Sequence, residues 1–181
     1  MKKVTTLGLA IAIFLQAQIL AGLYVLSALP LWTGTEIVVK TVPVDPRSMF
    51  RGNYARLRYD FSSVPVAELV EQARGRLRVG EIVYTELKKT ATGSYEPGKT
   101  FLKKPDSGVF LRGRIQKLPY YYRRRNSNNA LTGTVTVKYG IEAFFAPKEE
   151  ALRLERELRS SASAVLMVDS NGKARIKEIK A

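Results

Sequence analysis

An uncharged run near the N-terminus limits what this chain can fold into more than any other feature. Two lysines, Lys2 and Lys3, precede the run, and the next charged residue is Glu36. Its apolar core covers residues 7–31, whereas about 20 apolar residues are enough to cross a bilayer as a helix. The sequence therefore predicts one transmembrane helix, with residues 7–31 in contact with membrane lipid.

A cleaved signal peptide is the alternative interpretation of this run. The apolar core of a signal peptide has roughly 7–15 residues, fewer than are present here. Cleavage after Ala28 would also require a small residue two positions earlier, where the chain has Leu26. We therefore expect an uncleaved signal anchor over residues 1–34, followed by one domain over residues 35–181.

The two N-terminal lysines also predict the orientation of the helix. Positive residues beside a transmembrane helix tend to stay in the cytoplasm, and long domains cross the membrane largely regardless of their own charge. We expect a single pass through the cytoplasmic membrane, with the N-terminus inside and the C-terminal domain extracytoplasmic.

The absence of cysteine and histidine excludes several kinds of site. Disulfides, thiol nucleophiles, Cys/His zinc sites and Ser-His-Asp triads all require these residues. Glutamates cluster at residues 149–157, but arginines alternate with them, which is typical of a solvent-exposed helix. No glycine-rich phosphate-binding loop is present. We expect no cofactor, no metal ion and no catalytic residue.

The chain is strongly basic. Its net charge is +14, of which Lys2 and Lys3 account for two, so the domain after the anchor carries +12. Nucleic acid is the usual partner of such a domain in the cytoplasm. For a domain outside the cytoplasm we expect no nucleic acid; anionic headgroups, cell-wall polymers or an acidic protein are the expected partners instead.

The pattern of apolar residues predicts a β-rich domain of some six to eight strands with two helices. Alternation predicts strands at 36–42, 53–61, 77–87, 109–118, 131–139, 164–168 and 174–179, and the region 77–87 fits either one strand or two strands divided at Gly80. Helical spacing predicts helices at 65–75 and 147–159, and polar loops are expected at 90–98 and 118–130. The expected fold class is α+β, an N-terminal transmembrane helix followed by a mostly antiparallel sheet.

The stretch 45–61 is the most distinctive part of the predicted domain. An Asp-Pro pair suits the start of a short turn, and Gly52 tolerates a left-handed exit from it. From Asn53 onward apolar and polar residues alternate, which predicts a half-buried strand with Arg56 and Arg58 on its outer face.

The same stretch resembles a known family. Gly52, Tyr54, Leu57 and Tyr59 match the motif of the bacterial membrane-anchored family named GDYXXLXY, and residues 139–145 are similar to its second recognisable segment. The resemblance implies a protein of the bacterial inner (cytoplasmic) membrane with another integral membrane protein as its partner. It implies no particular activity.

One motif position differs, because Asn53 stands where the family motif has Asp. An amide keeps a turn-forming acceptor but loses the charge and the ability to accept a proton. If that aspartate were catalytic in relatives, this chain would be inactive. We interpret the motif as a turn followed by a strand, built by Gly52, Asn53, Tyr54, Leu57 and Tyr59.

Arginines on the outer faces of two predicted strands are the candidate residues for anion or partner contact. They are Arg56, Arg58, Arg112 and Arg114. If the strands are neighbours, these guanidinium groups can bind phosphate or carboxylate groups bidentately. Residues 74–78 would add arginines, and residues 120–125 would form an aromatic and basic tip suited to a membrane interface. The simpler interpretation is a solvated face that keeps the domain soluble.

A membrane-anchored Ser/Lys hydrolase is the alternative function. Ser48 and Met49 follow a single anchor, a faint similarity to type I signal peptidases, in which a lysine is the base for a serine nucleophile. Here the base would be Lys103, Lys104 or Lys117. The Pro after Ser-Met in these enzymes is replaced by Phe50, and Ser48 fits a capped turn equally well. The sequence therefore favours a non-enzymatic accessory or interaction module for another membrane protein or an anionic surface.

Overall fold

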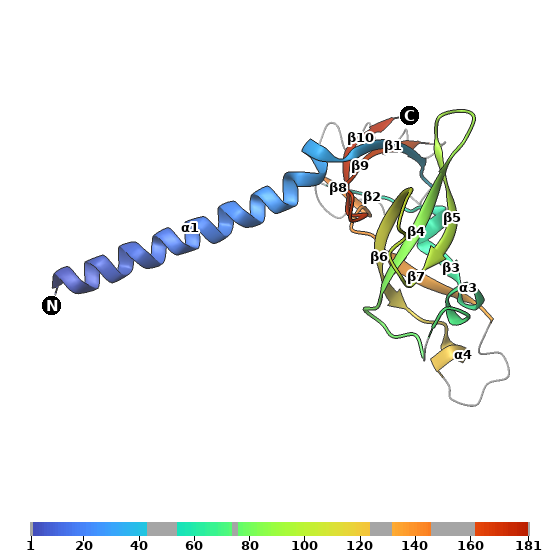
Figure 1. The fold of residues 1–181 in the computed structure, drawn as a ribbon, viewed down its shortest axis with the longest axis horizontal. Coiled ribbons are helices and arrows are strands. Elements are labelled where there is room, and N and C mark those ends of the chain that lie inside the picture. Colours follow the sequence, from blue (N-terminus) through green and yellow to red (C-terminus); the bar gives the residue numbers. More distant parts are fainter. Residues whose placement is uncertain (1, 43–53, 74–75, 124–131, 146–161, 181) are drawn as a thin grey trace.

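The structure is a computed structural model that describes residues 2–42, 54–73, 76–123, 132–145 and 162–180 (Figure 1). Predictions that fall on the remaining residues lie outside this description. They include the turn before Asn53, Ser48 and its neighbours, and the helix expected at 147–159.

A single long helix, α1 (Lys2–Thr33), projects away from the rest of the molecule (Figure 1). Its section Thr6–Thr33 is long and apolar enough to cross a membrane. Large apolar side chains on it are exposed from Leu7 onward, while Pro30 near its end is buried against the domain. Gly34 donates its backbone N–H to the Pro30 carbonyl oxygen at 3.0 Å, and there the helix passes into the first strand.

The described residues form ten strands, more than the six to eight expected, and most of them belong to one curled sheet. Eight strands pair in the order β10-β9-β1-β5-β4-β6-β7-β3, and β2 pairs with β8 separately. All neighbours are antiparallel except β1 and β5, so the predicted class, α+β with a mostly antiparallel sheet, is confirmed. The strands are β1 (Thr35–Lys40), β2 (Tyr54–Arg56), β3 (Ser63–Pro65), β4 (Ile82–Lys89), β5 (Tyr95–Phe101), β6 (Val109–Lys117), β7 (Thr134–Lys138), β8 (Ala143–Phe145), β9 (Ser163–Val168) and β10 (Ala174–Lys180).

Short helices connect the strands. A 3-10 turn, η1 (Asp60–Ser62), precedes β3, and α3 (Val66–Val70) follows it, shorter than the helix predicted at 65–75. Another short helix, α4 (Tyr120–Arg123), lies at the end of the domain that is farther from α1 (Figure 1).

Inward-facing side chains of the sheet form one core, as the alternation predicts. On β6, Leu111 and Ile115 are buried, while the arginines between them are exposed. Among the buried side-chain polar atoms of the described residues, Ser62 Oγ alone lacks a hydrogen-bond partner. The Tyr139 hydroxyl lies 2.7 Å from Thr85 Oγ1 and donates to the Phe61 carbonyl oxygen at 3.0 Å. Because buried polar groups cost free energy unless they are hydrogen-bonded, this cluster fixes how β4 and the end of β7 pack.

The polar loop predicted at 90–98 is wrong in its second half, because β5 begins at Tyr95. Its residues have low strand propensity, but pairing with β4 overrides this over the whole strand. Proline has no backbone N–H to donate, so it fits a strand only where no hydrogen bond is needed. Strand β5 pairs with β1 only at Tyr95, so the side of β5 that faces away from β4 is unpaired at Pro97. The register between β4 and β5 also shifts close to Pro97, between Thr85 and Leu87.

A glycine explains where each of two predicted strands begins. Gly80, with φ +89°, lies in a turn that is closed by the Glu81 N–H donating to the Arg78 carbonyl oxygen. The region 77–87 is therefore broken at Gly80, as one of its two interpretations allowed, and its strand begins only at Ile82. Gly133, with φ +99°, precedes β7 in the same way. A left-handed residue cannot continue a strand, and glycine adopts that conformation without steric cost.

The exposed aromatic tip expected at residues 120–125 is wrong for Tyr122, which is buried. Its hydroxyl accepts the Leu77 N–H at 2.8 Å, and the Arg76 guanidinium lies over its ring at 5.6 Å from the centroid. A tyrosine can bury its large apolar ring in the core when its hydroxyl finds a hydrogen-bond partner there. Tyr120 is exposed, as expected.

Replacing Gly113 of β6 with Ala is expected to destabilise the domain by ~1–3 kcal/mol, because the core leaves no space for an added methyl group and its neighbours would have to shift. A Cβ at Gly113 would meet Val137 Cγ1 and would lie 2.9 Å from the Tyr139 ring. Chemical denaturation of the purified protein measures the effect. Gly22→Ala in α1 is the matched control, since nothing lies within 4 Å of its Cβ; an equal loss in both variants would contradict the packing argument.

Candidate anion-binding surface

The described part of the motif is a structural element. Leu57 and Tyr59 are buried, with 1% and 3% of their surface exposed. The Leu57 N–H donates to the Glu142 carbonyl oxygen, and the Tyr59 hydroxyl donates to the Ile141 carbonyl oxygen, both at 2.9 Å. The two family-like segments of the sequence therefore bind each other, and β2 pairs with β8 within them.

The alternation predicted from Asn53 onward holds where side chains are described. Leu57, Tyr59 and Phe61 are buried, and Arg56 and Arg58 are exposed. Regular strand structure is shorter than predicted, because β2 ends at Arg56 and only a single bridge, between Val42 and Arg58, follows it. Gly52 and Asn53 lie outside the described residues, and of Tyr54 only the backbone in β2 is described.

Two tyrosines near this element are held in their neutral form. Burial raises the pKa of Tyr59 well above its usual range, and the Glu142 carboxylate raises it further. Burial likewise raises the pKa of Tyr139, against a smaller lowering by the hydrogen bond with Thr85. Their neutral form is favoured in the folded state, so this contribution to stability is complete below pH ~10 and is lost as the pH rises further. Both phenols therefore act as hydrogen-bond donors of the core.

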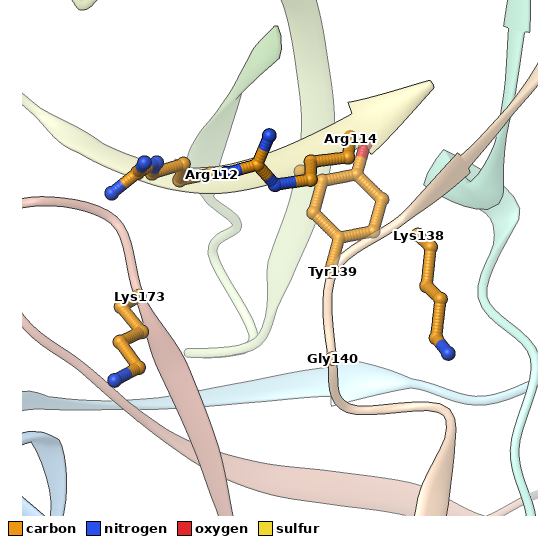
Figure 2. A pocket seen from close by; sticks show the side chains of 7 residues that line it. Arg112, Arg114, Lys138, Tyr139, Gly140 and Lys173 are labelled. Carbon is orange, nitrogen blue, oxygen red and sulfur yellow. The ribbon is translucent and has the colours of Figure 1, made fainter. Parts of the chain in front are cut away.

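Arg112 and Arg114 lie in a basic hollow, which we define by the side chains of Arg112, Arg114, Lys138 and Lys173. These cations come from β6, from β7 and from the turn between β9 and β10, and the cavity has a volume of about 330 Å³. Figure 2 shows the two arginines along β6, with Lys173 and Lys138 on opposite sides of the hollow. None of the described residues that line it is acidic.

The backbone explains why these cations converge. Gly113 faces the core between the two arginines, so both arginines face outward. The Arg112 N–H donates to the Gly172 carbonyl oxygen at 2.7 Å, which holds the β9–β10 turn against β6 and brings Lys173 to the hollow. Arg114 Nη1 donates to the Gly80 carbonyl oxygen at 3.1 Å, which orients its guanidinium group.

Arg56 and Arg58 line a second depression, the basic groove, together with Lys138. The groove has a volume of about 450 Å³. Its wall carries hydroxyl and amide groups from Ser62, Ser63, Gln116 and Thr136. Within the described structure the Ser62 Oγ is buried without a hydrogen-bond partner.

The four arginines were expected to form one stripe if their strands were neighbours, and that condition is not met. Strand β2 pairs with β8 in a separate two-stranded sheet, whereas β6 belongs to the main sheet, and the two pairs of arginines line different depressions. Lys138 and Gly140 line both the hollow and the groove, so the two depressions adjoin along one surface. Arg76 does not join this surface, because its Nη2 donates to the Tyr122 carbonyl oxygen at 2.5 Å.

Two cations of this surface were not singled out from the sequence. Lys138 occupies an outward-facing position of the strand predicted at 131–139, so the alternation itself could have identified it. Lys173 lies in a turn and reaches the hollow only because the hairpin packs on β6, which no local pattern indicates.

The residues of the hydrolase alternative are only partly described. Lys103, Lys104 and Lys117 are exposed, and Lys104 Nζ donates to Asn171 Oδ1 at 3.2 Å. A lysine that serves as a general base is normally desolvated, and none of these three is. Among the described residues there is also no group of three or more acidic side chains able to hold a metal ion.

Replacing Tyr59 with Phe is expected to lower the free energy of unfolding by about 1–2 kcal/mol, because the Ile141 carbonyl oxygen loses its buried donor. Tyr84→Phe is the control: Tyr84 packs its ring against Phe110, a contact that Phe retains. Denaturant titration of both variants measures the difference. An unchanged stability of the Tyr59 variant would contradict the structural role given to the motif.

A comparison with protein-family models found a match over most of the chain. The family model described as GDYXXLXY protein matches residues 16–179, from the second half of α1 to the end of β10. Comparisons with curated proteins and with solved structures found no match. Since the family match covers nearly the whole chain, this protein belongs to the GDYXXLXY family.

Proposed function

We propose that this protein is a single-pass, non-enzymatic interaction module of the bacterial inner membrane whose basic groove binds an acidic segment of another integral membrane protein. The observation that carries the proposal is the groove itself, in which Arg56 and Arg58 lie beside Lys138 and a set of hydroxyl and amide groups.

Length and exposure of α1 support the membrane anchor. Its apolar side chains are exposed from Leu7 to Leu26, about 20 residues, which at ~1.5 Å per residue span ~30 Å, the thickness of the hydrocarbon core. The helix from residue 27 onward is partly covered by the domain. With Lys2 and Lys3 on the cytoplasmic side, the domain lies outside the cytoplasm.

The cations of the groove have no ion-pair partner among the residues that the structure describes. Glu142 is the acidic residue among the described residues that line it, and its carboxylate accepts the N–H groups of Tyr139 at 2.5 Å and Gly140 at 3.0 Å. No described carboxylate forms an ion pair with Arg56 or Arg58. Exposed guanidinium groups without an internal partner are suited to bidentate binding of a carboxylate.

The composition of the groove favours a protein segment as the bound group. Ala143 is exposed and adds apolar surface to the cations and to the hydroxyl groups of Ser63 and Thr136. An acidic side chain with its neighbouring backbone matches such a mixed lining. Tethering by α1 also raises the effective concentration of the domain toward proteins of the same membrane.

The side chains that the chain has for catalysis support the non-enzymatic part of the proposal. The chain has neither histidine nor cysteine, and the hydroxyl groups of Tyr59 and Tyr139 are donors in buried hydrogen bonds. An acyl-serine probe that labelled the protein but not its Ser48→Ala variant would contradict this part.

The proposed orientation predicts that protease added to sealed, right-side-out membrane vesicles degrades the domain and leaves a fragment containing α1. Inverted vesicles from the same cells are the control, and in them we expect the domain to be protected until detergent is added. Mass spectrometry of the fragments gives the result, and protection in right-side-out vesicles would reverse the topology.

For the groove, a photo-crosslinking residue in place of Gln116 is expected to capture one integral membrane protein through a peptide rich in Asp and Glu. The charge reversals Arg56→Glu and Arg58→Glu together are expected to lower capture by about tenfold or more, because like charges then face each other. The crosslinked peptides are identified by mass spectrometry.

Two controls make the crosslinking specific. The crosslinker placed at Lys88, an exposed residue of β4, tests for random capture, and Lys88→Glu with Lys89→Glu reverses two charges outside the groove. Capture that ignores Arg56→Glu and Arg58→Glu, or a captured peptide without acidic residues, would overturn the proposal.

A further inference from the structure

The basic hollow lies against the anchor helix. Lys173 Nζ donates to the Leu26 carbonyl oxygen of α1 at 3.4 Å. Two residues later, Arg175 Nε donates to the Ser27 carbonyl oxygen at 3.2 Å, and its guanidinium also contacts the Ser27 hydroxyl. The β9–β10 turn thus runs back along the last turns of the helix, and the hollow, which includes Lys173, lies at the level of Leu26.

That level has a physical meaning if α1 spans a bilayer, as proposed above. The continuously exposed apolar section of the helix runs from Leu7 to Leu26, and the domain begins to cover the helix after it, although Leu31 and Trp32 are exposed again near its end. These about 20 residues are enough to cross the hydrocarbon core, so we place the end of that core near Leu26. The layer next to it contains the phosphate groups of the lipids. The hollow therefore opens at the height of the headgroups, and the long lysine and arginine side chains around it are of the kind that extend into this layer.

The chemistry of the hollow fits a phosphodiester. Arg112 and Arg114 present planar guanidinium groups that bind phosphate oxygens in pairs, and Lys138 and Lys173 add point charges from two other elements. None of the described lining residues is acidic, so nothing within this part of the structure neutralises the four cations. The buried ring of Tyr139 and the packed Gly113 give the hollow a rigid floor.

We propose that this hollow binds the phosphodiester headgroup of an anionic phospholipid from the leaflet that faces the domain. The proposal rests on the membrane anchoring given above, but not on the protein partner of the groove. One helix alone leaves the whole molecule free to rotate about the helix axis and to tilt in the membrane. A bound headgroup provides a second attachment, and because Lys138 and Gly140 line both depressions, it fixes the height and direction at which the groove faces its surroundings.

The test uses the full-length protein purified in a mild neutral detergent, titrated with dioleoylphosphatidylglycerol and, separately, with zwitterionic dioleoylphosphatidylcholine. Native mass spectrometry reports the bound lipid and its dissociation constant. We expect one phosphatidylglycerol to bind about tenfold or more tightly than phosphatidylcholine, since each basic residue near the phosphate adds to the attraction.

Charge-neutral variants then locate the site. The double variant Arg112→Gln with Arg114→Gln is expected to lose about tenfold or more of the phosphatidylglycerol affinity, and so is Lys138→Gln with Lys173→Gln. All four side chains are exposed, so both variants retain the core. Lys88→Gln with Lys89→Gln removes the same charge from β4 outside the hollow, and its affinity is expected to equal that of the wild type.

Three outcomes would overturn the proposal. The first is equal binding of the two lipids, and the second is unchanged phosphatidylglycerol affinity in either hollow variant. The third is binding of soluble glycerol phosphate as tightly as of the lipid, which would identify a free phosphate compound as the ligand. Arg56→Glu with Arg58→Glu is expected to lose partner capture and retain lipid binding, so failure of one proposal is distinguishable from failure of the other.

Discussion

The C-terminal hairpin holds this structure together. Strand β9 lies between β10 and β1, so the last segment of the chain pairs with the first strand after the anchor. Its turn is closed by Asp169, whose carboxylate accepts the N–H groups of Asn171 and Lys173. Gly172 then contacts β6 so closely that a Cβ would lie 2.7 Å from the Phe110 ring. The anchor, the sheet edge and the basic hollow all depend on this packing.

Elements that depend on local pattern were predictable. The hairpin at 164–179 and the strand at 109–118 occur where alternation places them, and the uncharged run forms one long helix. Elements that depend on distant partners were not. Strand β5 exists because β4 pairs with it, and Tyr122 is buried because Leu77 supplies a hydrogen-bond donor 45 residues away. Long-range contacts of this kind leave no periodic trace in the sequence.

The same division applies to the basic surface. Period-two alternation was enough to place Arg112 and Arg114 outward, and the same was true of Arg56 and Arg58. It could not show that the strands of the two pairs belong to different sheets, nor that Lys138 would connect the hollow with the groove. A surface assembled from three parts of the chain is set by tertiary packing, and only its individual outward positions are visible in the sequence.

The motif itself separates the fold from its surface. Its fixed Leu and Tyr positions are filled here by Leu57 and Tyr59, which are buried and bind the second segment, whereas Arg56 and Arg58 occupy positions that the motif leaves open and line the groove. Buried positions tolerate little change because a lost contact costs stability, while exposed positions can change at little cost. A signature made of such fixed positions identifies the scaffold. The residues that choose a partner are therefore to be sought at its variable positions.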